Sequence, residues 1–179
     1  MGQLLAFCAI SLLVIITPGQ DTALTIRNIL VGGRRAGMAT AVGIVAGQSV
    51  WSLATSAGLS AAVVAVQPLF LALRIAGSAY LIFLGLSALR SATRRHAADE
   101  PTAPRRGQIS AATALRQGLI SNVSNPKMIV FFTSLLPQFA TTFTGLALHG
   151  LLFSALTLAW LTLYTLAVAK ARHVLSRQR

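Results

Sequence analysis

The stretch ITPGQDT, residues 16–22, interrupts the first apolar run of the chain, residues 4–26. It contains Pro18, Gly19 and Asp21, and Asp21 is one of only three acidic residues in the sequence. A proline removes a backbone hydrogen-bond donor and breaks or kinks a helix. The sequence therefore predicts a helix that is broken at this point, with a carboxylate beside the break.

The composition predicts an all-α integral membrane protein. Of the 179 residues, 55% are hydrophobic and only 10% are charged, and the mean hydropathy is +0.72. Soluble domains carry roughly 25% charged residues. Residues 36–67 and 128–169 contain no Lys, Arg, Asp or Glu. At about 1.5 Å per residue, each of these runs is longer than the hydrocarbon core of a bilayer is thick.

Apolar segments alternate with short polar breaks along the whole chain. Five can be distinguished: residues 4–26, 36–66, 69–89, 115–136 and 146–169. We therefore predict five transmembrane helices in one polytopic domain, residues 1–179. The stretch 90–110 is rich in Arg, Ala and Pro and is a loop by composition, and residues 170–179 form a basic tail.

The net charge of +12 is distributed unevenly among the breaks. Lys and Arg follow the first and third apolar segments and fill the tail, whereas the breaks around Gln67 and over residues 137–145 contain none. By the positive-inside rule, the loop 90–110 and the tail 170–179 are cytoplasmic and the N-terminus is outside. Nucleic acid is not a predicted partner, because the basic residues are not interleaved with aromatic ones as in a nucleic-acid groove.

A second interruption lies in the fourth apolar segment, at NVSNPKM, residues 122–128. It places Asn122, Asn125, Pro126 and Lys127 within an apolar span. The first and fourth helices would cross the membrane in opposite directions. Paired interrupted helices of this kind indicate an inverted-repeat transporter whose site lies where the two halves meet. The freed backbone groups must line a cavity or be buried in protein, because they cannot face lipid.

Asp21 and Lys127 carry the sharpest chemical prediction. An ionised side chain at membrane depth marks a substrate or proton path by default. Asp21 would accept a substrate ammonium or carry a proton. Lys127, or backbone N–H groups after Pro126, would bind a carboxylate, so that the pair suits a zwitterion such as an amino acid. In the alternative interpretation, Asp21 caps the second half of the broken helix or forms a structural ion pair with Lys127.

Other polar residues have two interpretations each. Asn122 and Asn125 either cap helices or bind substrate. Gln48 either faces the cavity or forms a hydrogen bond between helices. Gly43 and Gly47 form a GxxxG pattern, which is typical of close helix packing. The sequence contains no metal-ligand spacing, phosphate-binding loop or nucleophile triad, so we expect no cofactor and no enzymatic activity.

Three stretches together resemble a known family. They are ITPGQDTALTIRNILVGGRRAGMATAVGIVAGQSVW (residues 16–51), LRIAGSAYLIFLGLSALRS (73–91) and LRQGLISNVSNPKMIVFFTSLLPQF (115–139). They resemble, in the same order, segments of the LysE/RhtB family of bacterial amino-acid exporters. The resemblance implies a six-helix unit in the bacterial inner membrane that exports amino acids or derivatives, driven by the proton motive force.

The resemblance also assigns the two interruptions to family motifs. Pro18, Gly19 and Asp21 match the first motif, and residues 125–127 match the second. The first motif reads PGQD here, where PGP is usual, and the chain ends at Arg179, where a sixth helix should follow. Three interpretations stay open: an exporter, with a homodimer partner that closes its cavity; a truncated, non-transporting paralogue or membrane scaffold; and a membrane-anchored regulator that acts through the basic loop.

Overall fold

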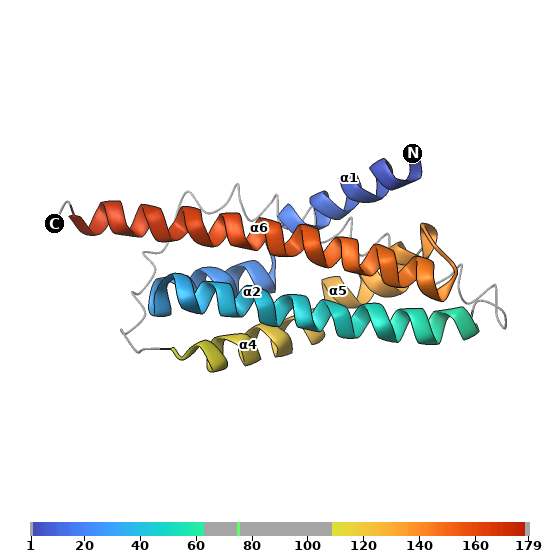
Figure 1. Ribbon diagram of the computed structural model, residues 1–179, viewed down its shortest axis with the longest axis horizontal. Coiled ribbons are helices and arrows are strands. Elements are labelled where there is room, and N and C mark those ends of the chain that lie inside the picture. The colour runs from blue at the N-terminus through green and yellow to red at the C-terminus, as the bar shows by residue number, and fades with distance from the viewer. Residues whose placement is uncertain (1, 63–74, 76–108, 178–179) are drawn as a thin grey trace.

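The computed structural model of the protein describes residues 2–62, 75 and 109–177, and these residues contain helices but no strand. The helices are α1 (Gly2–Ile16), α2 (Gln20–Ala62), α4 (Ala111–Val123), α5 (Pro126–Val130), a π-helix (Phe131–Leu135), a short 3-10 helix (Leu136–Gln138) and α6 (Phe143–Arg177). They lie along one long axis (Figure 1). The third predicted helix, residues 69–89, and nearly all of the loop 90–110 fall outside the described residues.

The second helix is a hairpin rather than one rod. Gly33 has φ 70° and ψ −165°, and it separates two helical parts of α2. A positive φ is accessible to glycine at little cost because glycine has no Cβ. We call residues 20–32 the first limb and residues 34–62 the second limb. Figure 1 shows the chain reversing direction between them.

Both predicted interruptions are present. The first apolar segment is divided into α1, which ends at Ile16, and the first limb, which begins at Gln20. The fourth segment is divided between Val123 and Pro126. In Figure 1, α1 and the first limb run toward the end of the bundle that holds the C-terminus, whereas α4 and α5 run away from it. The two broken segments therefore run in opposite directions, as the sequence predicted.

Glycines bring the second limb and α4 into backbone contact. A Cβ on Gly43 would overlap the carbonyl group of Leu115, and a Cβ on Gly118 would overlap the carbonyl oxygen of Thr40. Gly47 faces the side chain of Asn122 in the same interface. Small residues allow this approach in membrane helices, so the prediction of close packing at the GxxxG pattern is confirmed.

An aromatic cluster fills the half of the bundle nearer the N-terminus. Phe131 of the π-helix stacks on Phe153 of α6 with ring centroids 4.0 Å apart, and Phe132 meets the same ring edge-on. Phe7 of α1 packs against this core and makes an edge contact with His149. All four phenylalanines are buried.

Basic residues gather at the opposite end. The turn at Gly33, the start of α4 and the end of α6 lie together at the left of Figure 1. Arg34 and Arg35 adjoin the turn, Arg116 lies in the second turn of α4, and Lys170 lies near the end of α6. The predicted tail continues α6 as helix as far as residue 177. The side of the membrane that this end faces stays a prediction.

Within the residues that the structure describes, two helical stretches are long and apolar enough to cross a membrane. One is Gln20–Gly58, which includes the break at Gly33, and the other is Phe143–Lys170. The shorter apolar helix is Gly2–Ile16. Large apolar side chains are exposed on these helices, among them Leu13, Leu53, Leu148 and Leu163. Such exposure is expected where a helix faces lipid.

Candidate functional site

Asp21 connects the two interrupted segments. It lies in the first turn of α2, directly after the first break. One carboxylate oxygen accepts a hydrogen bond from Ser121 Oγ at 2.8 Å, and the other accepts bonds from Asn122 Nδ2 at 2.8 Å and Asn125 Nδ2 at 3.0 Å. All three donors are uncharged, and they come from the end of α4 and the break that follows it. The carboxylate is thus held across the two breaks by uncharged donors in the described part of the chain.

Lys127 makes the reciprocal connection. Its ammonium donates to the carbonyl oxygens of Val14 and Thr17 at the end of α1, each at 3.1 Å. In an unbroken helix the Val14 carbonyl would accept from the N–H of residue 18, but residue 18 is Pro18, which has none. The ammonium therefore replaces the bond that the proline removes, at the negative end of the helix dipole. A Cβ on Gly19 would lie 3.3 Å from Nζ, so the glycine keeps this approach open.

The structure distinguishes between the interpretations of these charges. Among the described residues there is no direct ion pair between Asp21 and Lys127, because each has the partners given above. The Asp21 carboxylate bonds to side chains of the other segment and does not cap its own helix. Asn125 does both things that the sequence allowed: its Oδ1 caps α5 by accepting from the Lys127 N–H at 3.0 Å, and its Nδ2 reaches Asp21.

One expectation is corrected. The sequence offered the backbone N–H groups after Pro126 as donors for a substrate carboxylate. The Lys127 N–H is bound to the Asn125 side chain, and the N–H groups of Met128 and Ile129 are bound to the Asn125 carbonyl. The cap thus uses these donors within the chain, which leaves the Lys127 ammonium as the candidate for an anion.

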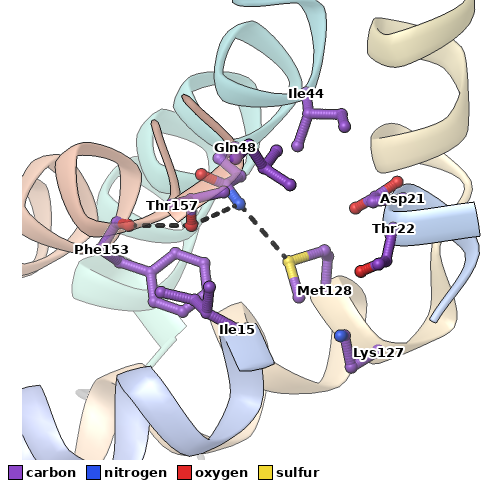
Figure 2. Close-up of a pocket in the computed structure, with 10 residues that line it drawn as sticks. Ile15, Asp21, Thr22, Ile44, Gln48, Lys127, Met128, Phe153 and Thr157 are labelled. Atoms are coloured by element: carbon purple, nitrogen blue, oxygen red, sulfur yellow. Dashed lines mark hydrogen bonds between the residues drawn. The ribbon is translucent and has the colours of Figure 1, made fainter. Parts of the chain in front are cut away.

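A small cavity lies between the two breaks, the second limb and α6 (Figure 2). Its lining consists of Ile15, Asp21, Thr22, Ile44, Gln48, Lys127, Met128, Phe153, Thr157 and Leu161. Figure 2 shows Asp21 and Lys127 on one side and Gln48 with Thr157 on the other, across Met128. The space admits water but not an amino acid. A larger ligand would require the helices around it to separate.

Gln48 combines its two predicted roles. Its Nε2 donates to Thr157 Oγ1 at 3.1 Å, which is a hydrogen bond between α2 and α6, and it lies 3.9 Å from Met128 Sδ. The side chain also lines the cavity and is only 2% exposed. Its Oε1 is buried and has no hydrogen-bond partner among the described residues. An unsatisfied acceptor beside a cavity is a place for water or for a polar ligand.

The remaining predicted residues are not among the lining residues of the cavity. Pro18 and Pro126 are exposed at the two breaks and shape the backbone. Asn122 is fully buried, and its Oδ1 has no hydrogen-bond partner in the part of the chain that the structure describes. The sequence reasoning did not select Ser121 or Thr157. Ser121 directly precedes Asn122, so its place beside the second interruption was the available signal.

Comparisons with known proteins identify the family. The sequence profile of the family described as LysE type translocator matches residues 12–179. The uncharacterized membrane protein YrhP of Bacillus subtilis is 32% identical over 144 residues, which cover 78% of this chain and 68% of the relative. The uncharacterized membrane protein PA4757 of Pseudomonas aeruginosa is 34% identical, with 80% and 65% covered.

A third relative has a functional name. The threonine efflux protein of Escherichia coli K12 is 26% identical over 161 residues, which cover 88% of this chain and 78% of the relative. The chain thus spans between 65% and 78% of the lengths of these three relatives. No solved structure matches the chain. With the profile match over nearly its whole length, this all-α integral membrane protein belongs to the LysE type translocator family.

Proposed function

We propose that this protein is a secondary transporter of the bacterial inner membrane that exports an amino acid or a close derivative, driven by the proton motive force. One observation carries the proposal: a carboxylate and an ammonium, each fixed at a helix break, line the same small cavity. Membership of a translocator family and a relative named for threonine efflux support it.

The two charges suit the two ends of a zwitterion. The Asp21 carboxylate attracts the substrate ammonium. The ammonium would take the place of one or more of the uncharged donors that now bond to this carboxylate. An ammonium has three N–H donors, and Lys127 uses two of them on α1 carbonyls. The third is available to a substrate carboxylate. An amino-acid backbone would therefore lie between residues 21 and 127, with its side chain toward Gln48 and Thr157.

Asp21 is also the group that couples export to protons. Among the described lining residues, Lys127 is the only other one with a formal charge at neutral pH, and its ammonium is bound to carbonyl oxygens. A proton bound to Asp21 removes the negative charge that holds the substrate ammonium, so substrate and proton compete for the carboxylate. Protonation from the outer side releases substrate there, and deprotonation toward the cytoplasm restores the site. Intramembrane carboxylates serve as proton relays in this way.

Orientation follows from the charge distribution. The end of the bundle with the Gly33 turn, the start of α4 and the end of α6 would be cytoplasmic, and the N-terminus would lie outside. The aromatic cluster then occupies the outer half of the protein. Export would require that cluster to open after substrate has entered from the basic end.

The test is amino-acid excretion from cells loaded with hydrolysable dipeptides. Cells that express the wild-type protein should release at least one amino acid faster than cells with an empty vector. Asp21→Asn should reach the membrane in equal amount and lose export together with its dependence on external pH. Thr133→Val is the control, because Thr133 follows the second break but its hydroxyl bonds within its own helical segment.

Two results would count against the proposal. If wild-type and empty-vector cells release all amino acids equally, the protein is a non-transporting membrane protein, such as a scaffold or regulator. If Asp21→Asn exports with the wild-type rate and pH dependence, the proton takes another route, and Asp21 only stabilises the contact between the two breaks through its hydrogen bonds.

A further inference from the structure

Buried polar side chains continue from Asp21 toward the basic end of the bundle. On the first limb, Thr25 and Asn28 follow Asp21 at spacings of four and three residues, which places all three on one helix face. Thr25 and Asn28 are completely buried. Thr25 Oγ1 donates to the Asp21 backbone carbonyl at 2.7 Å. The polar face therefore begins at the cavity and extends into the protein interior.

Asn28 joins three helical parts. Its Nδ2 donates to Thr40 Oγ1 on the second limb at 2.9 Å and to Gln117 Oε1 on α4 at 3.0 Å. Its Oδ1 is buried and has no partner in the described part of the chain. A buried amide oxygen without a partner is costly unless water satisfies it. The amide is therefore a fixed point for a water molecule between α2 and α4.

Thr165 on α6 is another buried polar residue beside the second limb. Its side chain is completely buried, and its Oγ1 has no partner among the described residues. It packs against Gly37, one turn before Thr40 on the second limb. Thr157 and Leu161, which line the cavity, precede it at four-residue spacing on α6. One face of α6 therefore leads from the cavity to this second group of buried polar atoms.

The side of the cavity nearer the N-terminus is aromatic rather than polar. There, Phe153 lines the cavity and stacks on Phe131, with Phe132 beside them. Packed aromatic rings offer no hydrogen bonds to a file of water. The polar connection from Asp21 thus runs toward the basic end, opposite the aromatic cluster.

We propose that a polar track carries protons along bound water between Asp21 and the basic end of the bundle. Its members are Thr25, Asn28, Thr40, Gln117 and Thr165. This rests on the proposed function, for which it supplies the proton route. In the step that restores the site, the protonated Asp21 gives its proton to a track water, leaving a carboxylate and a hydronium ion, and successive waters pass the proton on. Asn28 and Thr165 are positioning residues that hold these waters through their unpartnered oxygens.

Thr165→Val tests the track with little risk to folding. Valine has nearly the shape of threonine, and the replaced hydroxyl has no recorded hydrogen bond to lose, so stability should be unchanged or higher. Ser11→Ala is the matched control, since Ser11 Oγ is equally buried and unpartnered but lies on α1. Thr25→Val probes the cavity end of the track.

The variants would be reconstituted in liposomes with an isotopically labelled mixture of the twenty amino acids and a trapped pH-sensitive dye. Two rates are measured: substrate exchange without a pH gradient, and proton movement coupled to net efflux. Thr165→Val and Thr25→Val should lower coupled proton movement and net efflux several-fold while exchange keeps the wild-type rate. Ser11→Ala should match wild type in both.

Each other outcome contradicts a specific statement. If Thr165→Val and Thr25→Val move protons at the wild-type rate, the track is wrong and the proposed function stands. If exchange and proton movement fall together, the two threonines have a structural role and the track is again wrong. If the wild-type protein exchanges no amino acid, the proposed function itself fails, and the track fails with it.

Discussion

Lys127→Met tests whether the ammonium replaces the hydrogen bond that Pro18 removes. Methionine keeps the length of the apolar stem but cannot donate to the carbonyls of Val14 and Thr17. Lys127 is 8% exposed, so water reaches its neighbourhood poorly. The substitution would leave two carbonyls at the end of α1 without their charged partner.

The change in the free energy of unfolding caused by Lys127→Met is the difference between two opposing contributions. A hydrogen bond to a charged group contributes about 1.5–3 kcal/mol, so two give roughly 3–6 kcal/mol. Burial of the ammonium costs several kcal/mol in desolvation, which methionine does not incur. We expect a net loss of about 2–3 kcal/mol in the free energy of unfolding. That exceeds the roughly 0.6 kcal/mol average for neutral hydrogen bonds between membrane helices.

The assay is equilibrium unfolding of the purified protein in mixed detergent micelles, followed by the circular dichroism of its helices. Pro18→Ala provides a second arm, because it returns an N–H to the Val14 carbonyl. The double variant Pro18→Ala/Lys127→Met should therefore lose about half as much as Lys127→Met alone, which a double-mutant cycle detects as a coupling of about 1 kcal/mol. Additive effects in the cycle, or a Lys127→Met protein as stable as wild type, would refute the reasoning.

Three further predictions concern packing, the second break and topology. Gly118→Ala should destabilise by about 1–3 kcal/mol in the same unfolding assay, because its Cβ overlaps a backbone carbonyl of α2; Gly58→Ala, where a Cβ meets nothing within 4 Å, is the control and should not destabilise. Pro126→Leu restores an ordinary helix and should abolish amino-acid efflux from dipeptide-loaded cells, although the variant still reaches the membrane at wild-type levels. Normal efflux would show that the break is incidental. In a cysteine-free background, a cysteine at Ser110 should resist an impermeant thiol reagent applied outside and one at Thr142 should react, and the reverse pattern would overturn the orientation.

The sequence predicts the two breaks because their cause is local. A proline lacks its N–H wherever it stands in a helix, so Pro18 and Pro126 mark the breaks without knowledge of the fold. The opposite directions of the two segments followed from counting spans. The contact of Gly43 with α4 followed from the absence of a Cβ, which is also a property of a single residue.

The partners of the charged residues could not be predicted in the same way. Asp21 and Asn122 are 101 positions apart, and their contact depends on how two helices cross. The sequence suggested that Asp21 and Lys127 might pair with each other, since opposite charges in an apolar medium attract strongly. Helix ends offered other partners: orphan carbonyls at the end of α1 for the cation, and buried amide side chains at the second break for the anion. The sequence does not predict the polar track, because isolated Thr and Asn residues are common in membrane helices.

In the proposed transport cycle, the crossed arrangement would give the two charges different roles. Protonation of Asp21 leaves its hydrogen bonds intact in number, because the new O–H can donate to Ser121, whose hydroxyl also accepts, while the other oxygen keeps Asn122 and Asn125. Only the charge-assisted part of their strength, roughly half, is lost. The Lys127 bonds to α1 do not depend on that proton. In the proposed cycle, a proton on Asp21 therefore weakens this contact between the first limb and α4, whereas the Lys127 bonds keep α5 attached to α1.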